Sequence, residues 1–403
     1  MNDNGYIKSL DGVRAIAILL VMTFHTGITH FGWIGVQLFF VLSGFLITGI
    51  LWKEKFKTET LSYKFKKFWV RRSLRIFPLY FGYLAFWGIT YLCFHFPSYY
   101  HTYFPYLVTY TFNYARTLPA WHGNPLFTHL WSLSIEEQFY LFFPFIVFLC
   151  PPRLLKSFMV LVIIMAPLIR FLLGEYYRSK GFPGDIAGDA IYQNTLSHLD
   201  AFFMGGIIPV LSLNTRFKKP HILFITVFIV VALAGLWDFA HTLHPGTNYF
   251  LDLGFNHALV SNYEYIWHYS CLNALFASFL LMLVSIHSSQ RFSLLRKILE
   301  NKWMVRIGRV SYGMYIFHWA ILVYVFAKFF PVHSLAGQIL LFIPYTVAVY
   351  LLAQLSYKIY ESKFLKLKDK LFNGREDKTK GIPQIQVSSN LIPFLKEAQD
   401  ESL

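Results

Sequence analysis

The sequence predicts an all-α, polytopic integral membrane protein whose roughly ten transmembrane helices form one bundle. Its 403 residues are 56% apolar and only 14% charged, whereas an average soluble domain has about 25% charged residues. Ten apolar stretches are each long enough to cross a hydrocarbon core about 30 Å thick. Lys and Arg gather in every second segment between these stretches. This composition excludes a disordered chain and disfavours a water-soluble globule.

The ten apolar stretches define the expected domain organisation. Their approximate limits are 11–30, 34–53, 76–95, 131–150, 157–174, 195–213, 221–240, 267–287, 308–330 and 335–358. A shorter aromatic stretch, 103–114, is ambiguous because it can dip into the membrane or lie on its surface. We expect a membrane domain over residues 1–360. Residues 361–403 should form a partly disordered cytoplasmic tail, with a short amphipathic piece at 364–372 that can rest on anionic lipid.

The positive charge is explained by membrane topology. The sequence has 36 Lys and Arg residues against 21 Asp and Glu residues, a formal charge of +15. With both termini in the cytoplasm, 30 of these cations lie on the cytoplasmic side, four lie on the other side, and Arg14 and Arg170 lie within spans. The positive-inside rule predicts this asymmetry, and an eleventh span at 103–114 would scramble it. Nucleic-acid binding therefore loses its main support.

The N-terminal segment and the cysteines exclude a cleavable signal peptide and a cysteine framework, respectively. The first apolar stretch is expected to stay in the protein, because Asp3, Asp11 and Arg14 surround it and no small-residue cleavage site follows. The three cysteines lie in or at the ends of separate spans and have no pair spacing. Neither a disulfide framework nor a zinc site is therefore predicted.

The first span contains two ionisable residues, Arg14 and His25, on nearly the same face. Eleven helical steps of about 100° return to within about 20° of the starting direction. The axial separation of about 16 Å places Arg14 near the cytoplasmic end and His25 in the outer third. Ionisable groups within spans are expensive and usually functional. The alternative is an Arg that snorkels to lipid head groups and a His that is hydrogen-bonded within the bundle.

The fourth span begins with a polar segment that contains Glu136 and Glu137. Both carboxylates are expected at about the depth of His25, five to six residues below the outer surface. Adjacent helix positions point about 100° apart, so the two cannot face one pocket equally. One carboxylate can orient a histidine while the other pairs elsewhere. The alternative is that both lie at a wet rim of the bundle.

Other polar residues in spans give weaker signals. His198 and Asp200 lie near the outer side of the sixth span, His268 lies at the outer entrance of the eighth, and His318 lies near the middle of the ninth. A single His in an aromatic-rich span is more often a packing residue than a catalytic one. No His and Glu residues show the His-Glu-x-x-His spacing of a helical metal site, so no metal site is predicted.

Arginines at the start of the third span suggest an anion site. Arg72 and Arg75 are three residues apart, on one helical face at the membrane boundary, and with Arg14 they can form a cytoplasmic phosphate site. The alternative is ordinary positive-inside anchoring. Gly and Ser residues in segment 40–46 permit close helix packing, or equally leave room for a ligand.

Five ordered blocks of the sequence resemble the membrane-bound acyltransferase-3 family. The blocks are 9–17 followed by His25, then 35–48, 71–80, 130–140 and 308–319. The likeness covers about residues 5–360. It departs from the family at Gln37, where many relatives have Asp, which puts an acidic role at that position in doubt.

The resemblance implies a ten-span domain that moves acyl groups, often acetyl, from cytoplasmic acyl-CoA to extracytoplasmic acceptors. These acceptors are mostly sugars of cell-surface polysaccharides. Arg14 and His25 match the family's Arg-plus-His motif, and Arg72 and Arg75 match its paired arginines. Some relatives carry an additional extracytoplasmic hydrolase-like domain. Because only residues 361–403 follow the membrane part, we expect that domain to be absent and this chain to complete the transfer itself.

These implications give the expected site. We assign donor binding to Arg14, Arg72, Arg75 and Ser43. His25 would act as general base on an acceptor hydroxyl, oriented by Glu136 or Glu137, while a covalent acyl-His stays open as the alternative. Acceptor binding is assigned to Trp131, Ser134, Asp200 and His318.

The expected partners are acyl-CoA as donor substrate, a lipid-linked or surface carbohydrate as acceptor, and the lipid bilayer. No permanently bound cofactor, metal or nucleic acid is expected. The location implied is the bacterial cytoplasmic (inner) membrane, crossed many times.

Two other function classes stay open. One is an exporter of polysaccharide or small molecules with the same membrane fold, although the sequence shows neither an internal repeat nor paired spans broken by Gly or Pro. The other is a lipid-sensing scaffold, which would need neither Arg14 nor His25. The external loops 96–130 and 241–266 are rich in Tyr, His, Asn and Trp, which suit sugar rings but also suit an aromatic belt at the membrane interface.

Overall fold

The computed structural model is helical throughout the part of the chain that it describes. The described residues are 7–94, 99–118, 121–241, 249–255, 263–285, 292–332 and 334–376. Within these ranges there is no β-strand. The all-α fold class is therefore confirmed.

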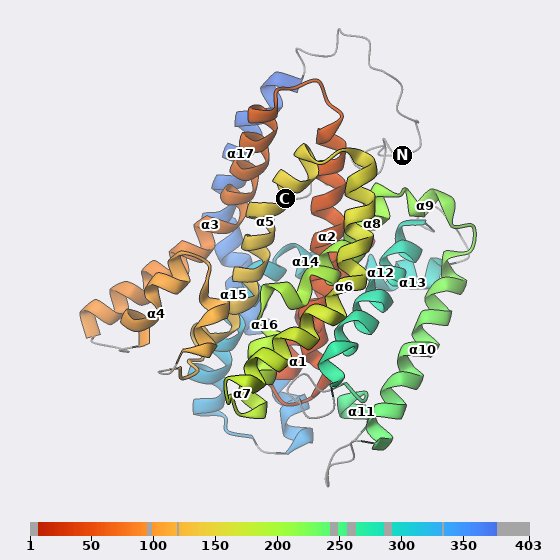
Figure 1. Ribbon diagram of the computed structural model, residues 1–403. Coiled ribbons are helices and arrows are strands. Elements are labelled where there is room, and N and C mark those ends of the chain that lie inside the picture. Colours follow the sequence, from red (N-terminus) through yellow and green to blue (C-terminus); the bar gives the residue numbers. More distant parts are fainter. Residues whose placement is uncertain are drawn as a thin grey trace.

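The long helices form the body of the bundle (Figure 1). They are α1 (Lys8–His25), α2 (Ile34–Lys55), α3 (Leu61–Phe94), α5 (Trp131–Leu149), α6 (Pro152–Ser179), α8 (Leu199–Val210), α10 (Pro220–His241), α12 (His268–Ser285) and α16 (Leu335–Ser356). The ninth predicted span is built from α14 (Lys302–Arg309), α15 (Ser311–Ile321) and η7 (Leu322–Ala327).

Shorter helices connect the long ones at both ends of the bundle. They are η1 (Phe31–Trp33), α4 (Tyr99–Val108), η2 (Phe112–Thr117), η3 (Thr128–Leu130), α7 (Gly184–Tyr192), η4 (Thr195–His198), α9 (Leu213–Arg216), α11 (Tyr249–Asp252), η5 (Glu264–Ile266) and α13 (Ser293–Leu299). In Figure 1 the turn between α2 and α3 and helix α9 lie toward the top, and α7 and α11 lie toward the bottom. This grouping matches the two sets of loops expected from the charge pattern, while the orientation itself stays a prediction.

Each of the ten predicted spans coincides with a helix or a helix pair. Seven helices in the described ranges are long and apolar enough to cross a membrane, and the count rises to eight if α14 and α15–η7, bent by 76° at their junction, form one span. The other two predicted spans correspond to α1, which carries three charged residues, and to the short apolar helix Thr195–Val210. The protein is thus a multi-pass membrane protein, and the number ten stays a prediction.

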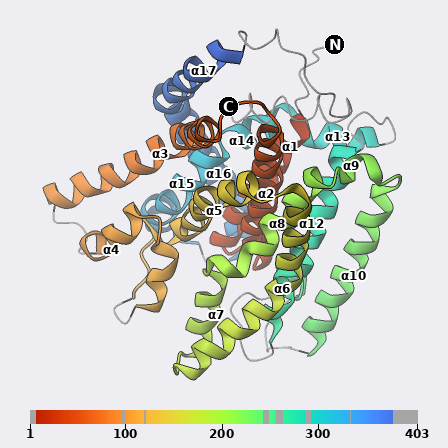
Figure 2. The ribbon, with the colours of Figure 1, turned by 45° about the horizontal axis from the view of Figure 1, so that its top comes forward.

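The ambiguous stretch 103–114 is divided between two short helices. Its first part belongs to α4, which has ten residues, and its second part belongs to η2. A helix of ten residues is too short to cross the hydrocarbon core, which needs roughly 20. Figure 2 shows α4 at the edge of the bundle, beside the outlying half of α3.

Helix α2 lies at the centre of the bundle, packed against α1, α5, α8 and α12. Two glycines allow α2 and α8 to approach backbone to backbone. A Cβ atom at Gly44 would collide with the backbone of Phe202, and one at Gly205 would collide with the backbone of Val41. Small residues at helix crossings permit such close packing in membrane proteins. Close packing is therefore one of the roles of segment 40–46.

Helix α1 is fixed by a second close contact, at its first turn. Cβ atoms at Gly12 and Gly308 would collide with the backbones of Leu299 and Asp11, respectively. This contact holds α1 against α13 and α14. It also fixes the position of Arg14, two residues after Gly12.

One of the predicted anchoring cations has a structural role. The Lys55 ammonium donates hydrogen bonds to the carbonyl oxygens of Val147 (2.8 Å), Phe148 (3.2 Å) and Cys150 (2.9 Å). These are among the last carbonyls of α5, which have no partner within that helix. The end of α2 is therefore tied to the end of α5.

The expected boundary at residue 360 does not mark the end of the helical structure. The chain continues through η8 (Tyr357–Glu361) into α17 (Ser362–Glu376), which packs along α3. Phe372 is buried, and its ring contacts Tyr63 and the guanidinium of Arg71. The amphipathic piece 364–372 thus packs on protein in the described structure, because its apolar face meets α3. The rest of the expected tail, 377–403, lies outside the described residues.

Candidate functional site

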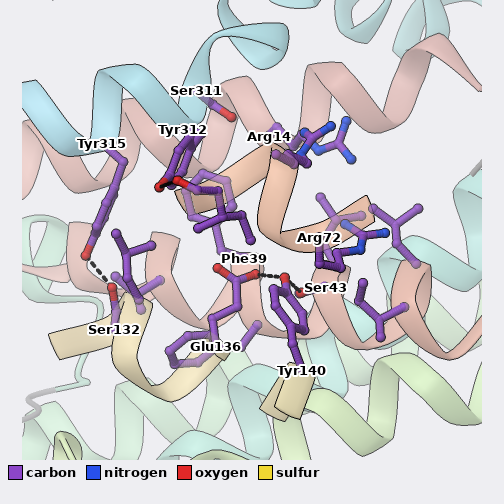
Figure 3. A pocket seen from close by; sticks show the side chains of 18 residues that line it. Arg14, Phe39, Ser43, Arg72, Ser132, Glu136, Tyr140, Ser311, Tyr312 and Tyr315 are labelled. Carbon is purple, nitrogen blue, oxygen red and sulfur yellow. Dashed lines mark hydrogen bonds between the residues drawn. The ribbon is translucent and has the colours of Figure 1, made fainter. Parts of the chain in front are cut away.

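A cavity of about 120 Å³ lies where α1, α2, α3, α5 and α15 meet (Figure 3). It offers room for several water molecules or a phosphate-sized group, since one water needs about 10–15 Å³ on this measure. Its polar lining comes from all five helices and comprises Arg14, Ser43, Arg72, Arg75, Ser132, Glu136, Tyr140, Ser311, Tyr312 and Tyr315. The four residues assigned to donor binding, Arg14, Ser43, Arg72 and Arg75, therefore share one cavity.

The cavity carries more positive than negative charge on its walls. Arg14 is paired with Asp11, whose Oδ1 lies 2.6 Å from a guanidinium nitrogen of Arg14. Within the described residues, neither Arg72 nor Arg75 forms an ion pair within 4.0 Å. Cations in a membrane helix are costly unless something compensates them. Two arginines one turn apart, on a cavity wall, are thus arranged to receive an anion.

Glu136 is the acidic residue of the cavity wall. It accepts a short hydrogen bond from the Tyr140 hydroxyl, which lies 2.5 Å from the Ser43 hydroxyl. Because Tyr140 donates to the carboxylate, Ser43 is the donor to Tyr140. The guanidinium of Arg72 stands 5.8 Å from the centre of the Tyr140 ring. Figure 3 shows this chain of groups in the middle of the cavity.

At its other end the cavity is lined by Tyr315 and Ser132. Their hydroxyl oxygens are 2.5 Å apart, and the Tyr315 hydroxyl also donates to the carbonyl of His129 (2.8 Å). The ring of Tyr315 lies 5.3 Å from that of His318, centroid to centroid. Tyr315 therefore contacts both the cavity and a group of histidines beyond it.

This histidine group consists of His25, His318 and His129. The rings of His25 and His318 have centroids 5.1 Å apart, as do those of His318 and His129. The ring of Trp319 covers His25 at 3.9 Å. His129 and His318 are buried, whereas His25 is partly exposed.

Hydrogen bonds to backbone carbonyls fix the protonation of the two buried histidines. Nδ1 of His318 lies 2.6 Å from the Tyr315 carbonyl oxygen, and Nε2 of His129 lies 3.2 Å from that of Ile316. A carbonyl oxygen only accepts, so each of these nitrogens carries the proton. The other nitrogens, Nε2 of His318 and Nδ1 of His129, have no hydrogen-bond partner within the described chain. In the neutral form, each ring thus keeps a lone pair on the nitrogen that has no hydrogen-bond partner.

The structure separates residues that the sequence placed together. We expected Glu136 and Glu137 beside His25, with the arginines at the opposite end. Instead, Glu136 lies on the same cavity as the arginines. Glu137 does not line the cavity, and its Oε1 is buried without a hydrogen-bond partner within the described residues. The expectation that the two carboxylates cannot face one pocket equally agrees with this arrangement.

Asp200, assigned to acceptor binding, lies in a buried ion pair. Its Oδ2 is 3.1 Å from a guanidinium nitrogen of Arg170 and accepts a hydrogen bond from Ser270 (2.6 Å), while Oδ1 accepts one from Asn273 (3.1 Å). Both members of the ion pair are 0% exposed. This network joins α6, α8 and α12 and does not line the cavity.

Trp131 and Ser134 are also packing residues in this structure. The Trp131 ring contacts Phe40 and Tyr192, and the Ser134 hydroxyl donates to the carbonyl of Leu130. Neither lines the cavity. Of the four residues assigned to the acceptor, His318 alone is in contact with His25 among the ring contacts described.

Sequence reasoning missed Ser132, Tyr140 and Tyr315 as site residues. A usable signal was present for Tyr140, which lies one turn after Glu136 on the same helix face. Tyr315 lies three residues before His318 on α15. Its position at the cavity depends on the bend between α14 and α15, which the sequence did not predict.

The sequence profile of a family described as an acyltransferase domain matches residues 7–358. "Putative O-acetyltransferase SAR0937" of Staphylococcus aureus strain MRSA252 is 29% identical over 97% of this chain and 62% of its own length. "O-acetyltransferase OatA" of Staphylococcus aureus strain NCTC 8325 / PS 47 is 27% identical over 91% of this chain and 58% of its own length. This chain thus spans about three fifths of the length of the curated relatives it matches. No solved structure matches it.

Proposed function

The chain belongs to the acyltransferase family whose domain covers residues 7–358, and we propose on that basis that it is a membrane O-acetyltransferase. The donor is a cytoplasmic acyl-CoA, with acetyl as the acyl group. The acceptor is a hydroxyl of an extracytoplasmic, lipid-linked or surface carbohydrate, and the location is the bacterial inner membrane. The relatives named as O-acetyltransferases support the reaction class.

One observation carries the proposal: an arginine-lined cavity and a histidine group stand next to each other, with Tyr315 in contact with both. The phosphates of the donor bind Arg72 and Arg75, with Arg14 as the third cation. Guanidinium groups suit phosphate because they offer several donors in a fixed plane. The pantetheine arm then extends past Ser132 and Tyr315 toward His25. Along α1, Arg14 and His25 are about 16 Å apart, which is comparable with the extended arm.

His25 is the general base in this mechanism. Its ring nitrogen takes the proton from the acceptor hydroxyl while that oxygen attacks the thioester carbonyl carbon. The carbon–sulfur bond breaks, the thiolate leaves, and the protonated imidazole returns the proton to sulfur. Products are the acetyl ester and free CoA thiol. A covalent acetyl-His25 is the second route. The imidazole first attacks the thioester carbonyl and expels the CoA thiolate; the acceptor hydroxyl then attacks the acetyl-imidazole, which releases the imidazole as it takes up the hydroxyl proton.

The groups around His25 differ from the expected triad. We assign the orienting role to His318 in place of a carboxylate, because its neutral ring lies beside His25 and its Nε2 keeps a lone pair. Glu136 belongs to the donor side, where it holds Tyr140 and Ser43. A carboxylate among three arginines prevents excess positive charge when the donor has left.

The test uses the full chain purified in detergent. We incubate it with radiolabelled acetyl-CoA and a carbohydrate acceptor, and measure label on the acceptor. His25→Ala should lower the rate of transfer about 10²–10⁴-fold, and Arg72→Ala should require more donor. Lys66→Ala is the matched control, because it removes an exposed cation from the same helix as Arg72. Near-normal transfer by His25→Ala would sink the mechanism. Carbohydrate flux across intact vesicles without any acceptor labelling would favour the exporter class instead.

A further inference from the structure

A second group of ionisable side chains lies away from the cavity, where α10 ends and α12 begins. Asp238 is in the last turn of α10, Glu264 is the first residue of η5, and His268 is the first residue of α12. One side-chain ligand atom from each lies within 4.8 Å of the others. The exposed fractions are only 6%, 2% and 0%, respectively. The group is distinct from the catalytic proposal above.

His268 is the member of the group that points most directly to a ligand. Its side chain is fully buried, and neither ring nitrogen has a hydrogen-bond partner within the described residues. Nε2 stands 3.5 Å from Oδ2 of Asp238, which is longer than an N–H···O hydrogen bond. A buried polar group without a hydrogen bond is costly. The nitrogen is thus directed at a carboxylate from a distance that suits two ligands of one ion.

The distances agree with a common metal. Nitrogen and carboxylate ligands lie about 2.0–2.2 Å from a zinc ion, which puts tetrahedral neighbours about 3.4 Å apart. The separation of His268 Nε2 and Asp238 Oδ2, 3.5 Å, matches this value. Ligand atoms of the group are at most 4.8 Å apart, so the most distant pair would have to approach by about 1 Å to share one ion. Rotation of the Glu264 side chain can supply this movement.

The surrounding structure holds these ligands in place. A Cβ at Gly235, three residues before Asp238, would collide with the Leu253 backbone, so the segment 249–255 is packed directly on α10. Gly254 has a φ of +69°, which favours glycine. The rings of Phe255 and Trp267 contact the His268 imidazole at 4.9 and 4.2 Å. His268 is therefore confined by aromatic walls.

We propose that Asp238, Glu264 and His268 form a binding site for a divalent transition-metal ion such as Zn²⁺ or Mn²⁺. Two carboxylates and a neutral imidazole supply two negative charges, which balance a divalent cation. Imidazole favours transition metals over Ca²⁺ and Mg²⁺, whose sites are built from oxygen ligands. The sequence pattern predicted no metal site here, because the three ligands come from three elements and not from one helical motif.

The ion would tie the end of α10 to η5 and the start of α12, and the segment 249–255 packs on this junction through Leu253 and Phe255. That segment also contacts the turn between α1 and α2. The Leu251 carbonyl accepts a hydrogen bond from the His30 amide (2.8 Å), and the Phe255 carbonyl accepts one from the Trp33 indole (3.3 Å). Nδ1 of His30 lies 3.1 Å from Oδ1 of Asp252. Metal binding at α10 and α12 would thus stabilise the end of the bundle where α1 turns into α2.

The experiment measures metal binding and thermal stability of the full chain, purified in detergent through an affinity tag without histidine. After chelation and dialysis, the protein is titrated separately with Zn²⁺, Mn²⁺, Mg²⁺ and Ca²⁺, and bound metal is counted by mass spectrometry. We expect about one Zn²⁺ or Mn²⁺ per chain and a Tm increase of about 5–10 °C at saturation. Mg²⁺ and Ca²⁺ should have little effect.

Variants assign the binding to these residues. His268→Gln, Asp238→Asn and Glu264→Gln should each lose the bound metal and the Tm increase. His241→Gln is the matched control, because it removes an exposed histidine one turn beyond Asp238. Absence of metal binding by the unaltered protein overturns the proposal whether or not the variants fold. Equal binding by the unaltered protein and folded His268→Gln, or equal stabilisation by Ca²⁺, overturns it as well.

Discussion

The imidazole rings of His25 and His318 lie side by side, tilted by 36° with their centroids 5.1 Å apart, although they come from the first and the ninth predicted spans. His25 sits at the end of α1, and His318 sits within α15, one turn from Tyr315 on the cavity wall. In the mechanism that we propose, a donor held in the cavity would reach these two histidines past Tyr315. Because the two rings belong to different helices, the role of each can be tested by substituting one histidine at a time.

His318→Gln should lower kcat more than it raises KM for either substrate. The change keeps a polar side chain but removes the ring beside His25. Because the proposed role of His318 is to orient His25, we expect a loss smaller than that for His25→Ala, for which general-base catalysis predicts about 10²–10⁴-fold. The measurement is steady-state transfer in detergent over a range of pH. A KM change without a kcat change would assign His318 to acceptor binding instead, as the sequence suggested.

Arg72→Ala should raise the KM for acyl-CoA, with little effect on the KM for the acceptor. Loss of a charged hydrogen bond costs about 1.5–3 kcal/mol, which corresponds to a KM increase of about 10- to 150-fold. Arg72→Lys should recover only part of this loss, because an ammonium cannot bind phosphate in the bidentate way.

Salt dependence provides the control for the arginine prediction. The KM for acyl-CoA should rise with ionic strength in the unaltered protein and less steeply in Arg72→Ala. Lys66→Ala, on the exposed side of the same helix, should behave like the unaltered protein. An unchanged donor KM in Arg72→Ala would contradict the assignment of the cavity to the donor phosphates.

Tyr140→Phe and Glu136→Gln should produce similar and non-additive defects. Tyr140 joins Ser43 to Glu136, so removal of its hydroxyl breaks both hydrogen bonds. Each single change should lower kcat/KM for the donor about 2- to 10-fold, the value of a hydrogen bond of 0.5–1.5 kcal/mol. The double variant should be no worse than the poorer single one. Additive losses would show that the two residues act separately.

The sequence predicted those features that depend on one helix alone, namely the length of a span and the face on which a residue lies. Span lengths follow from the thickness of the bilayer, so seven or eight of the predicted stretches coincide with a helix or bent helix pair long enough to cross it. Arg72 and Arg75 share a helix face at any packing, so their joint position in one cavity was foreseeable.

The sequence did not predict which side chains of different helices would meet. The depth argument placed Glu136 beside His25, but rotation of α5 about its axis decides which groups a carboxylate meets. The pairing of Asp200 with Arg170 and the meeting of Asp238 with His268 depend on the packing of three or more helices. No spacing along the chain encodes such packing.

Asp200→Asn should impair folding more than catalysis. The change leaves Arg170 as a buried charge without its counter-ion, a defect that costs about 3–5 kcal/mol. We expect less folded protein in the membrane and a lower Tm in detergent, while the folded fraction keeps a near-normal KM for the acceptor. Asp185→Asn, an exposed carboxylate at the first turn of α7, serves as control. Normal stability combined with a raised acceptor KM would restore Asp200 to the acceptor site.

Gly44→Leu should destabilise the bundle by separating α2 from α8. A side chain at this position meets the backbone of Phe202, which cannot move aside as a flexible side chain could. Overpacking of this kind typically costs about 1–3 kcal/mol, and it should cost more here because backbone meets backbone. Donor binding in the cavity should weaken as well, because the neighbouring residue, Ser43, donates a hydrogen bond to Tyr140 on the cavity wall. Thermal unfolding in detergent and the donor KM are the two measurements.

Gly184→Ala, at an open position, should change neither. A stable Gly44→Leu variant with normal donor binding would mean that the approach of α2 and α8 is not required.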